Sequence, residues 1–252
     1  MDRTATASAQ PMRDRMAALL GRRRELKWRR AGENLLEVSV MMCCRAAMVG
    51  AVAFSMASGS LFAATTEVLR NEKVDVTEWR LQPGEQAPLP AHHASVVVYM
   101  TGDAALAKMA DGTRQKIAVQ RGKAVDEAAR AGMLVNTGRE PLRFVRVEFL
   151  SPGAREMWGM TGLPPNYNMI FEDEHSRTYN IRIAAHEWEP QHTHHNRVVV
   201  CLSGAKLEHV LPDGSVQPST LKTDEVDWRP AQTHKGHNIG DTNLWVVAIE
   251  PK

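Results

Sequence analysis

The chain has 252 residues, of which 43% are hydrophobic, enough for one large globular domain or two small ones. Its 31 Lys and Arg nearly balance its 29 Asp and Glu, and residues 1–45 alone carry ten basic against five acidic side chains. The remainder is therefore slightly acidic, which argues against a nucleic-acid partner.

The first 64 residues are predicted to be a basic preamble followed by a targeting segment. Residues 46–66 carry no charge, follow Arg45 directly and contain many small side chains. This outline is typical of a cleaved signal peptide and predicts a periplasmic or secreted protein. A membrane anchor and a buried helix are the alternatives, so the chain would meet a membrane only through this segment. Because the preamble is unusually long, we hypothesise that translation starts at Met41 or Met42.

The rest of the chain contains an internal repeat with a constant offset of 102 residues. HHASVVVYMTG begins at His92 and HHNRVVVCLSG begins at His194, and six of these eleven positions are identical. The same offset superimposes the two Asp-Gly pairs without a gap, which indicates a tandem duplication. Each copy combines β-branched runs, hairpin signals and almost no helical periodicity. The sequence therefore predicts an all-β fold of two tandem small barrels.

The repeat defines the domain boundaries. We expect residues 65–150 to form the first copy and residues 178–252 the second. Residues 151–177 between them are rich in Pro, Gly and Asn, which is typical of a linker. Only Cys201 would remain after removal of a signal peptide, so no disulfide is expected within one mature chain.

The second copy resembles the cupin superfamily, and the pair of copies resembles a bicupin. The first cupin motif, G-x5-H-x-H-x3,4-E-x6-G, is matched at His192, His194 and Gly204. Residues 230–238 follow the second motif, with His234 at its histidine position. The resemblance implies a small antiparallel jelly-roll barrel for each copy. It also implies a metal ion inside the second barrel, held by His192, His194 and His234.

The departures from the cupin pattern are informative. Arg197 occupies the position of the motif glutamate, and a guanidinium cannot ligate a cation. In the first copy, Pro90 and Gly132 stand at the positions of His192 and His234. The first barrel is therefore expected to be a degenerate copy without a metal site.

Three imidazoles in a dry cavity suit a divalent transition metal such as iron, zinc or copper, with positions left for water or substrate. Strand alternation places His192 and His194 on one face and His195 on the other. Continued along the strand, it predicts that Val198, Val200 and Leu202 line the barrel. A metal-free pocket and purely structural histidines are the alternatives.

Other residues are candidates for substrate binding. Arg197 could anchor an anionic small molecule through its guanidinium fork, or form an outward salt bridge. His186 is expected to enter the same cavity at the barrel rim. His195 and His237 are secondary candidates, with a surface position favoured for His237. His209 is expected to be a solvated strand residue.

No motif of a serine hydrolase, P-loop, dinucleotide site or HExxH metalloprotease is present. Glu187 and Glu189 fit either an acid/base role or a solvated strand edge. Three functions stay open. The chain is a metalloenzyme of the dioxygenase, isomerase or hydrolase class, a non-catalytic module that binds or senses a small molecule without metal, or a structural module that pairs with another chain, as in a homodimer.

Overall fold

The computed structural model describes residues 63–252. The predicted targeting segment therefore lies outside the described residues, apart from its last two positions, and so do both candidate start methionines. Every regular element among residues 63–252 is a β-strand, which confirms the all-β prediction. Within this part of the chain, no helix could cross a lipid bilayer.

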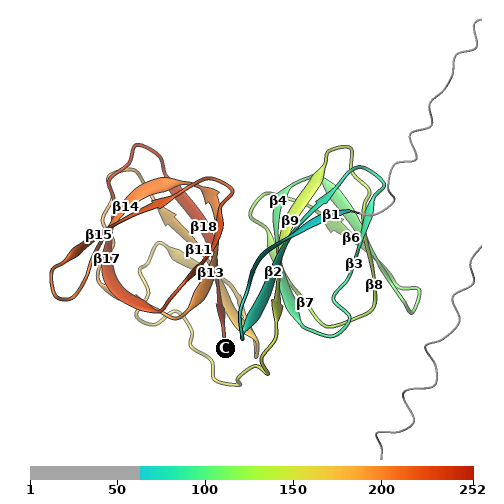
Figure 1. Ribbon diagram of the computed structural model, residues 1–252, viewed down its shortest axis with the longest axis horizontal. Coiled ribbons are helices and arrows are strands. Elements are labelled where there is room, and N and C mark those ends of the chain that lie inside the picture. Colours follow the sequence, from blue (N-terminus) through green and yellow to red (C-terminus); the bar gives the residue numbers. More distant parts are fainter. Residues whose placement is uncertain (1–62) are drawn as a thin grey trace, which may run out of the picture. The chain divides into compact units, whose positions relative to one another are not determined.

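The first repeat forms a barrel from two antiparallel sheets (Figure 1). Its strands are β1 (Ala64–Arg70), β2 (Val74–Leu81), β3 (Gln86–Pro88), β4 (Ser95–Thr101), β5 (Ala104–Met109), β6 (Arg114–Ala118), β7 (Ala124–Glu127), β8 (Gly132–Asn136) and β9 (Leu142–Phe149). One sheet has the order β1-β2-β9-β4-β7 and the other has the order β3-β8-β5-β6. Both sheets contribute side chains to the apolar core of this barrel.

The second repeat has the same architecture. Its strands are β10 (Tyr167–Glu172), β11 (Ser176–Ile183), β12 (His192–His194), β13 (Arg197–Ser203), β14 (Ala205–Val210), β15 (Val216–Leu221), β16 (Val226–Arg229), β17 (Gln232–Asn238) and β18 (Leu244–Pro251). The sheets have the orders β10-β11-β18-β13-β16 and β12-β17-β14-β15. Each order repeats that of the first barrel with every strand number raised by nine, so the predicted duplication is confirmed.

The strand register repeats with the same offset as the sequence. Val96 pairs with Val147 in the first barrel, and Val198 pairs with Ile249 in the second. Val198 lies 102 positions after Val96, and Ile249 lies 102 positions after Val147. Even the irregularity between β4 and β9 has its counterpart between β13 and β18.

Strand β10 lies inside residues 151–177, the segment that the sequence predicts to be a linker. It pairs with β11, and its first residue, Tyr167, is only 6% exposed. The Pro, Gly and Asn residues that precede it hide its alternation in the sequence. The second barrel therefore begins at Tyr167 rather than at residue 178.

The two five-stranded sheets pack against each other through a shared apolar cluster. Its members include Val96, Val98, Val145 and Val147 from the first barrel and Val198, Val200, Val247 and Ile249 from the second. Each barrel thus covers an apolar face of the other, in addition to enclosing its own interior.

This packing corrects the predicted direction of the side chains on β13. Val198, Val200 and Leu202 lie in the cluster between the barrels, whereas Val199 points into the second barrel beside Arg197. The reason is a two-residue break between β12 and β13, which spaces the inward residues His194 and Arg197 by three positions instead of two.

Gly122 makes a testable contribution to this packing. Its φ is +78°, and an added Cβ would lie 2.3 Å from the ring of Trp245 and 2.7 Å from Leu202. We expect Gly122→Ala to lower the free energy of unfolding by about 2–4 kcal/mol, because it adds a steric clash to backbone strain. Gly112→Ala is the control, since Gly112 has a φ of +89° but nothing within 4 Å. Equal losses in urea unfolding would contradict the role of Trp245.

Candidate metal centre

Three buried histidines come together on neighbouring strands of the second barrel. His192 and His194 share one face of β12, and β17 runs antiparallel beside it with His234 directly opposite His192. Their exposed fractions are 4%, 2% and 2%. One nitrogen of each ring lies within 4.8 Å of the others. This is the only such group of three among residues 63–252.

Hydrogen bonds fix the tautomers of the two β12 histidines. Nδ1 of His192 lies 2.8 Å from the Pro190 carbonyl oxygen, which can only accept, so this nitrogen carries the proton. Nδ1 of His194 lies 3.0 Å from the Tyr179 hydroxyl, which donates its own proton to Glu250 at 2.8 Å. Nδ1 of His194 is therefore also the donor. Both Nε2 atoms are left with lone pairs, and they face each other at 2.9 Å.

This arrangement fits a metal ion. Two imidazole nitrogens that bind one ion at about 2.1 Å and at right angles lie about 3.0 Å apart. The distance between Nε2 of His192 and Nε2 of His194 is close to this value. The ring of His234 also keeps a buried nitrogen, Nδ1, without a hydrogen-bond partner among the described residues. Three neutral nitrogen donors favour iron, zinc or copper over magnesium or calcium.

Glu250 on β18 contacts the histidine cluster through His194 and Tyr179. Its carboxylate is fully buried and accepts hydrogen bonds from Tyr179, from Nε of Arg177 at 2.8 Å and from the backbone N–H of His195 at 3.1 Å. Burial alone would raise the pKa of Glu250, but His194, Arg177 and Tyr179 together lower it to about 2. An ionised carboxylate therefore faces Nδ1 of His194 at 3.7 Å and orients that ring.

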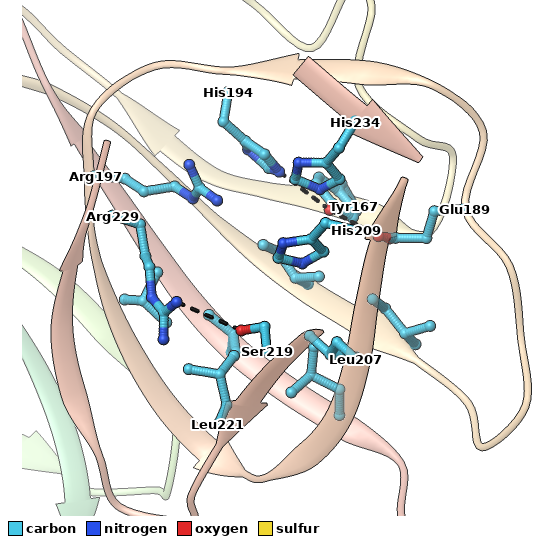
Figure 2. Close-up of a pocket in the computed structure, with 15 residues that line it drawn as sticks. Tyr167, Glu189, His194, Arg197, Leu207, His209, Ser219, Leu221, Arg229 and His234 are labelled. Carbon is cyan, nitrogen blue, oxygen red and sulfur yellow. Dashed lines mark hydrogen bonds between the residues drawn. The ribbon is translucent and has the colours of Figure 1, made fainter. Parts of the chain in front are cut away.

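A small pocket of about 50 Å³ lies beside the histidines (Figure 2). Most of its wall is apolar and includes Ile181, Ile183, Val199, Leu207, Leu244 and Val246. Its polar groups come from His194, His234, Tyr167, Glu189, His209, Ser219, Arg197 and Arg229. The volume admits only a molecule of a few heavy atoms.

Arg197 points into this pocket and is only 6% exposed. Its Nη1 donates weakly to the carbonyl oxygens of His195 at 3.4 Å and Pro230 at 3.2 Å. Its Nε has no hydrogen-bond partner, and no carboxylate of the described residues pairs with it. Burial lowers the pKa of Arg197. A buried guanidinium without a counter-ion favours the binding of an anion.

Tyr167 and Glu189 also belong to the site; nothing in the sequence indicated Tyr167, and Glu189 was left open between an acid/base role and a solvated strand edge. The Tyr167 hydroxyl lies 3.2 Å from Nε2 of His192 and 3.5 Å from Nε2 of His194, and it donates to Glu189 at 3.3 Å. Glu189 is 4% exposed, so it does not lie on a solvated strand edge. Burial raises the pKa of Glu189 to about 7, although Asn166 and Tyr167 oppose the shift.

His209 also lines the pocket, contrary to the prediction that it is solvated. Its ring stacks on that of His234, with the ring centroids 4.2 Å apart. Burial is the main cause that lowers the pKa of His209 to about 4. The alternation of β14 was the available signal, because Leu207 points inward two residues earlier.

The other predicted histidines lie outside this pocket. His186 does not enter the cavity as predicted, because it sits in a turn with a φ of 65° and its side chain is 65% exposed. His195 points to the opposite face from its neighbours and stacks on Trp158 at 4.0 Å. The ring of His237 stacks on that of Trp188, with the ring centroids 3.9 Å apart, and Trp188 is 58% exposed.

No family model and no curated protein matches the sequence. Solved structures do match. A cupin 2 conserved barrel domain protein from Leptotrichia buccalis has a TM-score of 0.51 at 14% identity, covering 75% of this chain and 89% of its own. AerE from Microcystis aeruginosa has a TM-score of 0.53 at 13% identity, with coverages of 77% and 100%. An oxalate decarboxylase variant from Bacillus subtilis has a TM-score of 0.54 at 14% identity, with coverages of 75% and 72%. The chain therefore has the cupin fold, with two barrels in tandem as in a bicupin.

Proposed function

We propose that the second barrel binds one divalent transition metal ion through His192, His194 and His234 and holds a small anionic molecule beside it. The observation that carries this proposal is the pair of Nε2 lone pairs that face each other at 2.9 Å between two buried histidines. A cation between them removes their repulsion. Mn(II) centres are named for the oxalate decarboxylase of Bacillus subtilis, so manganese joins iron, zinc and copper as a candidate.

The residues around the cluster suit acid/base chemistry on a small carboxylate. Arg197 would bind the anion, and the apolar wall would exclude water. Glu189 and Tyr167 share one hydrogen bond, and a pKa of about 7 lets Glu189 accept or release a proton near neutral pH. A bound metal ion would supply Lewis acidity. This set favours a reaction that moves a proton, within the dioxygenase, isomerase or hydrolase classes.

A second candidate is a metal-free module that binds or senses the same kind of anion. It is favoured by Arg197, which stands at the position of the ligating glutamate in the cupin motif and is buried in the pocket. The arginine replaces a negative charge by a positive one and so weakens the binding of any cation nearby.

Metal analysis of the full chain, purified without an affinity tag, tests the proposal. We expect about one equivalent of a transition metal in the native protein and less than about a tenth of that in His192→Ala and His234→Ala. His237→Ala is the matched control, because His237 lies on the same strand as His234 but stacks on Trp188 outside the pocket. A folded native protein that takes up no iron, manganese, zinc or copper on dialysis would contradict the metal site. The metal-free binding module would then be the remaining function.

A further inference from the structure

The two barrels carry opposite charges at one pair of equivalent positions. In the second barrel, Arg197 on β13 lies directly opposite Arg229 on β16. In the first barrel, the same register pairs Ser95 on β4 with Glu127 on β7. Ser95 corresponds to Arg197 and Glu127 to Arg229, each at the offset of 102. Where the second barrel presents two cations, the first therefore presents a hydroxyl and a carboxylate.

Ser95 and Glu127 line a groove of about 580 Å³, whose other wall includes Asp173, Glu174 and His175 from the turn between β10 and β11 of the second barrel. No Lys or Arg is among the residues that line it, whereas its carboxylates come from Asp126, Glu127, Asp173 and Glu174. Phe149 and His175 stack with ring centroids 5.8 Å apart and add a flat apolar wall. The groove thus combines negative charge with apolar surface.

Two of the lining side chains are buried, and each carries an oxygen without a hydrogen-bond partner in the described part of the chain. Ser95 is 1% exposed and Glu127 is 4% exposed. Neither Oγ of Ser95 nor Oε2 of Glu127 has a hydrogen-bond partner, and Nδ1 of His175 in the same groove also has none. Buried polar atoms without partners are rare in proteins and costly, and they point to a missing ligand or water.

Arg146 does not neutralise Glu127 fully. Its Nη2 lies 3.7 Å from Oε2 of Glu127, which is too long for a hydrogen bond. Its Nη1 donates instead to the Pro88 carbonyl oxygen at 2.8 Å, and its guanidinium lies over the rings of Trp79 and Phe144. Burial raises the pKa of Glu127, although Arg146 and Arg130 oppose the shift.

We propose that this groove, lined by the first barrel and by the turn between β10 and β11, binds the ammonium group of a small aliphatic amine. The –NH₃⁺ group donates to Oε2 of Glu127 and Oγ of Ser95, which satisfies both buried oxygens. The alkyl chain lies against the wall formed by Phe149 and His175, and the carboxylate of Glu174 at the rim meets a second ammonium group.

A metal ion is a poorer occupant than an amine. Among residues 63–252, the groove residues form no group of three ligand atoms close enough to share one ion. The groove is also far larger than an ion and carries apolar surface that an alkyl chain would cover. The groove therefore differs in chemistry from the histidine cluster of the second barrel.

Calorimetric titration of the full chain with 1,4-diaminobutane tests the proposal. We expect saturable one-site binding that weakens at least tenfold in Glu127→Gln. Because Glu127→Gln also affects Arg146, the rim variant Glu174→Gln is the second test, with an expected loss of about threefold. Glu67→Gln, an exposed carboxylate on β1 outside the groove, is the control and should bind like the native chain.

Parallel titrations separate the outcomes. His192→Ala should bind the diamine normally, so the amine site stands even if the proposed metal site fails. Saturation by magnesium or calcium chloride with no response to the diamine would overturn the proposal in favour of a cation site. Absence of diamine binding up to about 10 mM, or equal affinity in the native chain, Glu127→Gln and Glu174→Gln, would also overturn it.

Discussion

Replacement of Glu250 by alanine is expected to lower the free energy of unfolding by about 3–5 kcal/mol and the metal affinity about 10–100-fold. Glu250 is fully buried, and its removal leaves the guanidinium of Arg177, which is only 3% exposed, without its anion. The same change removes the carboxylate that faces Nδ1 of His194. Urea unfolding measures the first effect, and competition with a chromogenic chelator measures the second.

Glu78→Gln provides the matched control for this prediction. Glu78 also accepts hydrogen bonds from an arginine, Arg143, but that pair is partly exposed and Arg143 keeps a second partner in Asp224. We expect a loss below about 1 kcal/mol and an unchanged metal affinity. If Glu250→Ala leaves the metal affinity intact, the carboxylate has only a structural role.

Replacement of Arg197 by methionine is expected to stabilise the fold by about 1–2 kcal/mol while it weakens the binding of a small carboxylate about 100-fold. The guanidinium is buried without a counter-ion, and its two hydrogen bonds to carbonyl oxygens are long. Methionine removes the cost of that buried charge and keeps much of the volume. Urea unfolding and calorimetric titration with oxalate measure the two effects.

Arg229→Met is the control that distinguishes the effect of the Arg197 charge from that of the neighbouring arginine. Arg229 lies opposite Arg197 but pairs with Asp227 at 2.9 Å and is partly exposed. We expect no gain in stability and a loss of carboxylate affinity below about tenfold. A destabilised Arg197→Met variant that binds oxalate as well as the native chain would show that Arg197 serves the fold alone.

The fold was predictable because the same strand and turn pattern occurs twice in the sequence. A constant offset of 102, β-branched runs and Asp-Gly turns indicated two equal all-β units, and the strand register follows that offset residue by residue. The start of the second barrel was not predictable, because the local Pro, Gly and Asn content around Tyr167 reads as a linker. Only pairing with β11 identifies that segment as a strand.

The candidate site was only partly predictable. The spacing of His192 and His194 placed both rings on one face, and antiparallel pairing brought His234 opposite. The break before β13 could not be read from HTHHNRVVV, because both faces of that strand are apolar and buried. The sequence named Glu189 but could not decide between its two alternatives, since its burial comes from contacts with β10 and β17 that are remote in the sequence.

The apolar face that the two barrels share constrains how this chain can evolve. The positions on that face are nearly the same in both copies, with Val96, Val98 and Val145 matched by valines and Val147 by Ile249. A gene that encoded only one half would leave this face open to water and prone to aggregation. The positions near the two pockets differ between the copies, with Pro90 matched by His192 and Glu127 by Arg229. A substitution on the shared face therefore affects the stability of both barrels, whereas a substitution at a pocket position affects one of them.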